Sequence, residues 1–184
     1  MQKPSLAILF ITAFSLIFTI SCDTDDPFQL PDPDFSTVPP PFDFQNTEPV
    51  EVEEGVQVYV LDEGSGPFEV TTRDQVSVFL TLRTTDGDEI YSTFTDDRVS
   101  AIPVSMRVAG DIQNSLQFSI IWAYTPGFKS GMLGMKEGER RTIIVSPEKG
   151  YGNASSGNIN AQYRESTLQY DVQVSAINPK KSVN

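Results

Sequence analysis

Residues 125–152 read TPGFKSGMLGMKEGERRTIIVSPEKGYG and place a helix, a turn, a strand and a tyrosine loop in one unbroken run. Phe128, Met132 and Met135 recur at positions i, i+4 and i+7, which is the spacing of one apolar face of an α-helix. Glycine often ends a helix because it tolerates left-handed backbone angles. The pattern therefore predicts a short helix that buries Phe128, with Gly138 supplying the turn that ends it.

A strand and a loop follow this helix in the sequence. Residues 140–146 predict a strand that Pro147 ends, because proline cannot donate to the hydrogen-bond ladder of a sheet. Tyr151 then stands between Gly150 and Gly152. Two flexible neighbours allow its aromatic hydroxyl to overhang a pocket.

Alternation of apolar and polar residues dominates the rest of the chain. Residues 75–84 and 167–177 both alternate with the period-two pattern of a half-buried antiparallel strand. Asp86-Gly87 predicts a hairpin turn after the first of these strands. Residues 55–66 predict a strand followed by a glycine turn. Together these segments predict an α+β domain with an antiparallel sheet packed on a helix.

The order of these elements resembles the FKBP-type peptidyl-prolyl cis-trans isomerases. The resemblance spans about residues 55 to 177 and is most specific over residues 125–152. It implies an α+β fold in which a twisted antiparallel β-sheet wraps around one short helix. We expect this FKBP-like domain to occupy residues 55–178, with a C-terminal tail at residues 179–184.

The composition limits the chemistry. The chain has 184 residues, of which 39% are hydrophobic, and this allows one domain of ordinary size plus tails. It has no histidine, which removes the usual general base and the imidazole metal ligands. The net charge of −12 argues against a nucleic-acid partner, since binding to phosphates needs a basic surface. We expect neither a metal ion nor a cofactor.

The N-terminus predicts export. Cys22 is the only cysteine and follows an apolar run at residues 6–20. This arrangement resembles a bacterial lipoprotein signal peptide at residues 1–21, which implies lipid attachment to Cys22 and a membrane partner through that anchor. An ordinary secretory signal or an uncleaved anchor helix is the alternative interpretation.

An acidic segment follows the cysteine. From Asp23 to Glu54 there are ten acidic residues, seven prolines and no Lys or Arg, so we expect residues 22–54 to form an extended tether. Four phenylalanines in it could dock on another surface, although such residues in a linker are more often unstructured. The acidic residues after Cys22 look like the surface-export signals of some Bacteroidetes lipoproteins, whereas in enterobacteria an aspartate there looks like inner-membrane retention. Both alternatives place the protein in the cell envelope, on the outer membrane, at a periplasmic face or exposed at the surface.

Rotation about an X-Pro bond requires no acid or base. The amide must lose its partial double-bond character, which costs roughly 18–20 kcal/mol, and an apolar cleft shaped around the twisted amide stabilises that state. The resemblance assigns the floor of such a cleft to Phe128 and a hydrogen-bonding hydroxyl to Tyr151, as the catalytic pair. It also assigns a substrate-binding backbone amide to Tyr124 or Thr125.

Several other positions that match the family's cleft carry different side chains here. Leu80 stands in place of a strand tyrosine, and Ile90-Tyr91 replaces a Phe-Asp pair. Val104 matches the place of a wall phenylalanine. These substitutions remove aromatic walls and a carboxylate, so the resemblance implies a weakened site.

Two further residues belong to the expected cleft, and a third, Trp122, allows two interpretations. Tyr170 replaces a phenylalanine of the C-terminal strand, and Ile159 is the expected pocket contact in the loop after Tyr151. Trp122 lies in a connection longer than in minimal family members. It either folds over the cleft or packs in the core beneath an inserted loop.

The leading hypothesis is a peptidyl-prolyl cis-trans isomerase, weak in activity, that helps exported proteins fold. Its partners would be proline-containing polypeptide segments. The alternative is a non-catalytic FKBP-like binding module of an envelope lipoprotein, which would keep the fold and use a remodelled cleft for a peptide, a glycan or a partner protein.

Overall fold

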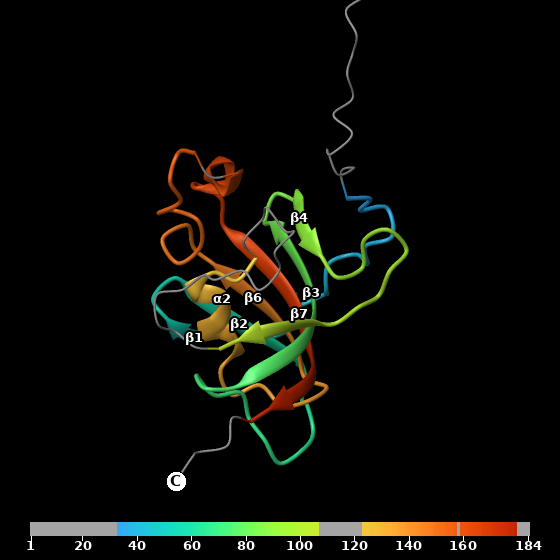
Figure 1. The fold of residues 1–184 in the computed structure, drawn as a ribbon. Helices are drawn as coiled ribbons and strands as arrows, with labels where there is room; N and C mark the ends of the chain where they lie inside the picture. Colours follow the sequence, from blue (N-terminus) through green and yellow to red (C-terminus); the bar gives the residue numbers. More distant parts are fainter. Residues whose placement is uncertain (1–32, 107–122, 158, 180–184) are drawn as a thin grey trace, which may run out of the picture. The chain divides into compact units, whose positions relative to one another are not determined.

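The computed structural model describes residues 33–106, 123–157 and 159–179 (Figure 1). In this part of the chain no helix is long and apolar enough to cross a membrane. The predicted signal peptide, Cys22 and Trp122 lie outside the described residues. The elements are β1 (Val50–Glu53), β2 (Val56–Asp62), β3 (Gln75–Thr84), β4 (Glu89–Ser92), β5 (Ile102–Ser105), α2 (Pro126–Met132), β6 (Arg140–Val145), the 3₁₀ helix η2 (Ile159–Tyr163) and β7 (Leu168–Asn178).

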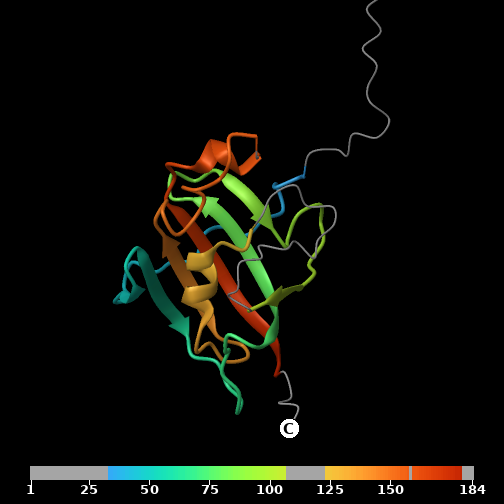
Figure 2. The same cartoon turned by 60° about the vertical axis from the view of Figure 1, so that its left-hand side comes forward.

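The described strands form one antiparallel sheet. Their order is β1-β2-β6-β7-β3-β4, and β5 also pairs with β3. The longest pairing joins β3 to β7, from Gln75 opposite Asn178 to Thr84 opposite Leu168. Helix α2 lies against one face of the sheet, nearest to β2 and β6, and Figure 2 shows it in front of that face. The expected α+β architecture is confirmed.

The alternating segments form the central strands. β3 has the predicted bounds, and β7 begins one residue later than predicted, at Leu168. Apolar side chains of both strands point toward α2 and form the core, because successive residues of a strand face opposite sides. The predicted hairpin turn after β3 is also present, with Gly87 at φ +104°, which only glycine adopts readily.

Helix α2 has a defined start and an earlier end than predicted. Thr125 caps it by accepting a hydrogen bond from the N–H of Phe128. The helix ends at Met132, and Gly134 adopts φ +76° just beyond it. The prediction that Gly138 ends the helix is therefore wrong, because Gly134 already supplies the left-handed residue that a helix end favours. Met135 packs in the turn that follows and is fully buried.

Close approach fixes α2 on the sheet. A Cβ atom at Gly131 would lie 2.4 Å from Cγ2 of Ile143 on β6, so only glycine fits there. Arg141 of β6 donates to the carbonyl oxygens of Gly131 at 2.8 Å and Leu133 at 3.0 Å. These carbonyls have no partner within the helix. One strand thus supports both the face and the end of α2.

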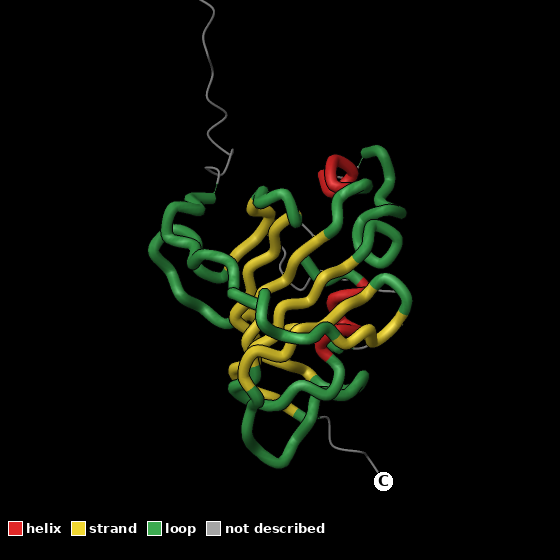
Figure 3. The backbone as a smooth tube through the Cα atoms, turned by 180° about the vertical axis from the view of Figure 1, so that it is seen from behind, coloured by secondary structure: helices red, strands yellow, loops and turns green. Residues whose placement is uncertain are grey.

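Residues 33–49, which we call the strap, cross the face of the sheet opposite α2 and contact it at Arg83, Asp171, Arg140 and Tyr59. Residues 33–54 were expected to belong to an extended tether, but the structure differs: the strap lies on the sheet and continues into β1, which pairs with β2. The folded unit begins at Pro33. Figure 3 views the molecule from this side, where a loop crosses in front of the strands.

Aromatic contacts explain part of this docking. The guanidinium of Arg140 lies 4.4 Å from the ring centroid of Phe42, within the range of a cation–π contact. The rings of Phe44 and Tyr59 lie 4.6 Å apart. From the sequence, docking of the phenylalanines in this segment was considered the less common outcome. Phe42 and Phe44 nevertheless dock on the sheet.

A buried ion pair explains the rest. Arg83 of β3 and Asp171 of β7 are joined at 2.5 Å, and each side chain is 3% exposed. The strap gives this pair two further partners, because Nη2 of Arg83 donates to the carbonyl of Pro39 at 3.2 Å and the N–H of Phe42 donates to Asp171 at 3.2 Å. Buried charges are tolerated only when their polar atoms are satisfied in this way. The strap is therefore part of the fold.

Replacement of Asp171 by Asn should destabilise the domain strongly. The change keeps the shape but removes the buried counter-charge of Arg83 and leaves only the more distant carboxylate of Glu89, 3.9 Å from Nη2. Breaking a buried pair in this way costs about 3–5 kcal/mol. The loss is measured as a lower free energy of unfolding in urea, with the full chain in mild detergent. The matched control Asp86→Asn, in the exposed hairpin turn, should change stability by less than about 0.5 kcal/mol. Equal stability of the two variants would contradict the role of the ion pair.

Candidate functional site

Three aromatic side chains stack at the N-terminal end of α2. The ring of Phe128 lies 4.6 Å from that of Tyr170 and 6.0 Å from that of Tyr124, with interplanar angles of 22° and 19°. Phe128 and Tyr170 are 0% exposed. Tyr170 comes from β7, so the stack joins the helix to the middle of the sheet. We call Tyr124, Phe128 and Tyr170 the aromatic stack.

Hydrogen bonds hold the stack in place. The hydroxyls of Tyr170 and Thr125 lie 2.9 Å apart, and Oγ1 of Thr125 also accepts from the N–H of Phe128 at 3.3 Å. The hydroxyl of Tyr124 donates to the carbonyl of Pro103 on β5 at 3.3 Å. The stack is therefore linked by hydrogen bonds to the helix cap and to β5.

Tyr151 lies in a tight loop after β6. The N–H of Gly150 donates to Ser146 at 2.9 Å and that of Gly152 donates to Pro147 at 2.7 Å. A Cβ atom at Gly152 would lie 2.7 Å from the carbonyl oxygen of Pro147. The glycines that flank Tyr151 are thus required by close packing of this loop, rather than by flexibility as the sequence suggested.

The tyrosyl hydroxyls of this region remain neutral over the physiological range. Burial raises the pKa of Tyr151 well above its usual value, and the nearby phenols of Tyr170 and Tyr163 add to this. Burial also raises the pKa of Tyr170 and of Tyr124, the latter with a smaller contribution from Tyr91. These groups can donate or accept hydrogen bonds, but they cannot serve as bases.

Most of the predicted site residues come together in one buried cluster. Leu80, Ile90, Val104 and Tyr151 belong to the same core cluster as the aromatic stack, and Tyr91 packs against it. Ile159 does not, since it is 42% exposed at the start of η2. The sequence suggested that Phe128 forms the floor of an open cleft. Because Phe128 and Tyr170 are fully buried, they are instead part of the core.

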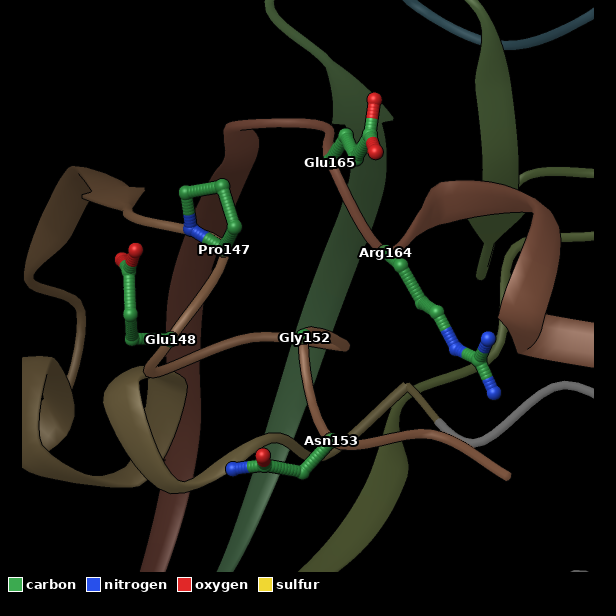
Figure 4. Close-up of a pocket in the computed structure, with 6 residues that line it drawn as sticks. All are labelled: Pro147, Glu148, Gly152, Asn153, Arg164 and Glu165. Atoms are coloured by element: carbon green, nitrogen blue, oxygen red, sulfur yellow. The ribbon is translucent and has the colours of Figure 1, made fainter. Parts of the chain in front are cut away.

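A hollow lies beside the tyrosine loop. Its volume is about 430 Å³, and Figure 4 shows the residues around it. None of the predicted site residues lines it, and three of its six lining residues are charged. The lining residues are Pro147, Glu148, Gly152, Asn153, Arg164 and Glu165.

Two contacts of the cluster were missed from the sequence. Tyr163, at the end of η2, lies with its ring 6.3 Å from that of Tyr151, and Pro103 supplies the acceptor for Tyr124. Neither belongs to a periodic pattern, and a backbone carbonyl leaves no signal in a sequence. Tyr163 is the one aromatic residue between Tyr151 and β7 in the sequence, and this was the only clue to its contact.

The arrangement supports apolar contact and neutral hydrogen bonding. Within residues 33–106, 123–157 and 159–179, no group of three or more His, Cys, Asp or Glu side chains is placed to hold a metal ion. Aromatic faces and neutral hydroxyls can surround an uncharged group such as a prolyl ring and its amide. They can also exclude water from it.

A family model and a curated relative that match this chain agree with each other. A sequence model of the family described as FKBP-type peptidyl-prolyl cis-trans isomerase matches residues 66–175. FK506-binding protein 1A from Neurospora crassa is 31% identical over 106 residues, which make up 58% of this chain and 76% of that protein.

Solved structures share the fold. FkpA from Escherichia coli gives a TM-score of 0.52 at 22% identity, covering 68% of this chain and 49% of that chain. A multi-domain immunophilin from Arabidopsis thaliana gives 0.57 at 20% identity, covering 79% and 50%. The N-terminal domain of FKBP42 from the same plant gives 0.56 at 19% identity, covering 78% and 99%. The chain spans about half the length of the first two, and likeness at these identities shows the fold alone.

The buried tyrosines predict lower stability at alkaline pH. The folded-state pKa values of Tyr124, Tyr151 and Tyr170 lie above the ordinary value of 10.0, so the unfolded chain releases these protons first. Stability should not depend on these groups below pH 10 and should fall as the pH rises above it. In an alkaline titration, their tyrosinate absorbance should appear together with loss of near-ultraviolet circular dichroism.

Tyr151→Phe should remove one tyrosine from that late step. Ionisation of all six tyrosines near their ordinary pKa while the circular dichroism remains native would contradict the prediction.

Proposed function

Because the chain belongs to the FKBP-type peptidyl-prolyl cis-trans isomerase family, we propose that it accelerates cis-trans isomerisation of X-Pro bonds in polypeptides. The observation that carries the proposal is the aromatic stack at the start of α2, beside Tyr151. It supplies apolar faces and neutral hydroxyls around the position that the family resemblance assigns to the substrate.

The proposed mechanism needs no proton transfer. An amide that twists loses its planar, charge-separated resonance form, and surroundings of low polarity favour the twisted state over the planar one. The ring of Phe128 would pack against the prolyl ring, and the Tyr151 hydroxyl would bond to a substrate carbonyl. Reorientation of a few side chains would be required, since Phe128 is 0% exposed and Tyr151 is 5% exposed.

A non-catalytic binding module is the second candidate. It is favoured by the burial of Phe128 and Tyr170 and by aliphatic residues at Leu80 and Ile90, where the family resemblance expects aromatic ones. Such a module would use the same region to hold a peptide, a glycan or a partner protein. For this reason we propose that isomerase activity is weak.

We also propose that the protein is exported and lipid-anchored through Cys22 in the cell envelope, where exported proteins would be its clients. The apolar run before this lone cysteine supports the anchor. The folded unit begins at Pro33, so the proposed tether is limited to residues 22–32.

Substitution of Phe128 tests the catalytic proposal. Phe128→Leu removes the aromatic face but keeps the site apolar, which limits the loss of stability. The value of kcat/KM for a proline peptide should fall about tenfold or more, equivalent to about 1.4 kcal/mol of transition-state stabilisation. Tyr151→Phe should cost less, about 0.5–1.5 kcal/mol for one neutral hydrogen bond.

The matched control is Val174→Ala, a buried change on β7, with the fold of each variant checked by circular dichroism. Activity should survive in this control. If the folded wild-type chain accelerates no proline peptide and still binds a partner that Phe128→Leu fails to bind, the binding module replaces the enzyme.

Substitution of Cys22 tests the anchor. Cys22→Ala should leave the chain unprocessed or release it from membranes, because on this proposal the acyl anchor would be attached to Cys22. Membrane fractionation and intact mass of both proteins give the result. A mutant that remains in the membrane fraction at its mature mass, with a wild type that carries no acyl group, would show that the lipoprotein proposal is wrong.

A further inference from the structure

The strap also contacts the loop between β4 and β5, residues 93–101, which we call the wall loop. We propose that this contact makes the strap a positioning element of the candidate site: by holding the wall loop, it keeps β5 and the Tyr124 side chain in place. The inference deepens the proposed function and rests on it for its effect on activity. Its structural part is independent of catalysis.

Four hydrogen bonds join the two segments. The N–H of Asp34 donates to Oδ1 of Asp96 at 3.1 Å, and the N–H of Asp96 donates to the carbonyl of Asp34 at 3.1 Å. The hydroxyl of Thr37 donates to the carbonyl of Phe94 at 2.6 Å and accepts from the N–H of Asp97 at 3.4 Å. Backbone groups of the wall loop that no neighbouring strand pairs are thus bonded to the strap.

The wall loop needs such support because its backbone is strained. Asp96 and Asp97 have φ of +56° and +57°, and two consecutive residues other than glycine rarely adopt this left-handed region. The N–H groups of both residues donate to the strap, so the strap stabilises the strained conformation where it occurs.

The wall loop leads directly into the candidate site. At its start, Thr93 bonds to both backbone groups of Leu80, with distances of 2.8 and 3.0 Å. At its end, β5 places Val104 in the buried cluster and the carbonyl of Pro103 against the Tyr124 hydroxyl. A shift of the wall loop would therefore move the acceptor that orients one member of the aromatic stack.

The strap itself is fixed elsewhere. Pro39 and Phe42 bond to the buried ion pair of Arg83 and Asp171, and Phe42 also lies against Arg140. Residues 34–37, which bond to the wall loop, are thus only a few positions along the chain from residues that are fixed on the sheet. Figure 1 shows the strap (blue) beside the wall loop.

Thr37 and Asp96 are therefore positioning residues, which act on the site without contacting substrate. Thr37→Val removes the hydroxyl and keeps the shape, and Asp96→Ala removes the acceptor and the side chain best suited to positive φ. Asp96→Asn retains both properties and should behave like wild type. Thr47→Val is the control, because its backbone N–H bonds within the strap, to Phe44, and not to the wall loop.

The experiment compares these variants in the full chain, in mild detergent, by hydrogen exchange and by isomerase kinetics. Thr37→Val and Asp96→Ala should speed amide exchange in the wall loop and β5 by about tenfold, while β6 and β7 keep their wild-type rates. Their kcat/KM should fall about threefold or more, since small displacements of a site reduce turnover. Asp96→Asn and Thr47→Val should match wild type in both measurements.

Wild-type exchange in the wall loop and β5 of both Thr37→Val and Asp96→Ala would overturn the inference and leave the strap as a cover for the ion pair only. Faster exchange with unchanged kcat/KM would overturn its link to activity. If the wild type has no isomerase activity, the proposed function fails by itself, and exchange in β5 still decides whether the strap positions the site.

Discussion

The buried ion pair of Arg83 and Asp171 determines what must surround the sheet. Both residues lie on central strands and are 3% exposed, so each polar atom needs a partner within the protein. Thr142 and Gln169 supply two from neighbouring positions on the sheet. On the Arg83 side, Oε1 of Glu89 on β4 lies 3.9 Å from Nη2, and backbone groups of the strap bond to both members of the pair. A bare outer face would leave this pair incompletely satisfied, and for this reason an acidic, proline-rich segment becomes part of the domain.

The same strand that carries the ion pair carries the aromatic stack. Asp171 faces the strap, and its neighbour Tyr170 faces α2, where it stacks on Phe128. Successive side chains of a strand point to opposite faces, so a one-residue slip of β7 would exchange a charge for an aromatic ring. The register that pairs Tyr170 with Leu82 and Asp171 with Thr81 is thereby specified from both sides. Position of the stack and satisfaction of the ion pair are consequences of one register.

The central strands and the helix could be predicted because their signals are local. Alternation located β3 and β7, and the spacing of Phe128 and Met132 located α2. The strap could not be predicted in this way, since its composition is typical of disorder and its partners, Arg83 and Asp171, are polar residues distant in sequence. In the site, the family resemblance placed Tyr151 and the stack near one another. Burial of Phe128, the contact with Tyr163 and the acceptor at Pro103 depend on tertiary packing, which no local pattern records.

The candidate site combines neutral hydroxyls with a surrounding of low polarity, and both follow from burial. Burial raises the pKa of Tyr124, Tyr151 and Tyr170, so these hydroxyls stay neutral and cannot serve as bases. It also lowers the polarity around any amide that enters, which favours the twisted form of an X-Pro bond. Burial also limits the access of a substrate to the aromatic stack, because fully packed side chains leave no room for it. The position of the residues that surround such a site must therefore be well fixed. The hydrogen bond between Tyr124 and Pro103 links the aromatic stack to β5, and the wall loop in turn links β5 to the strap on the other face of the sheet.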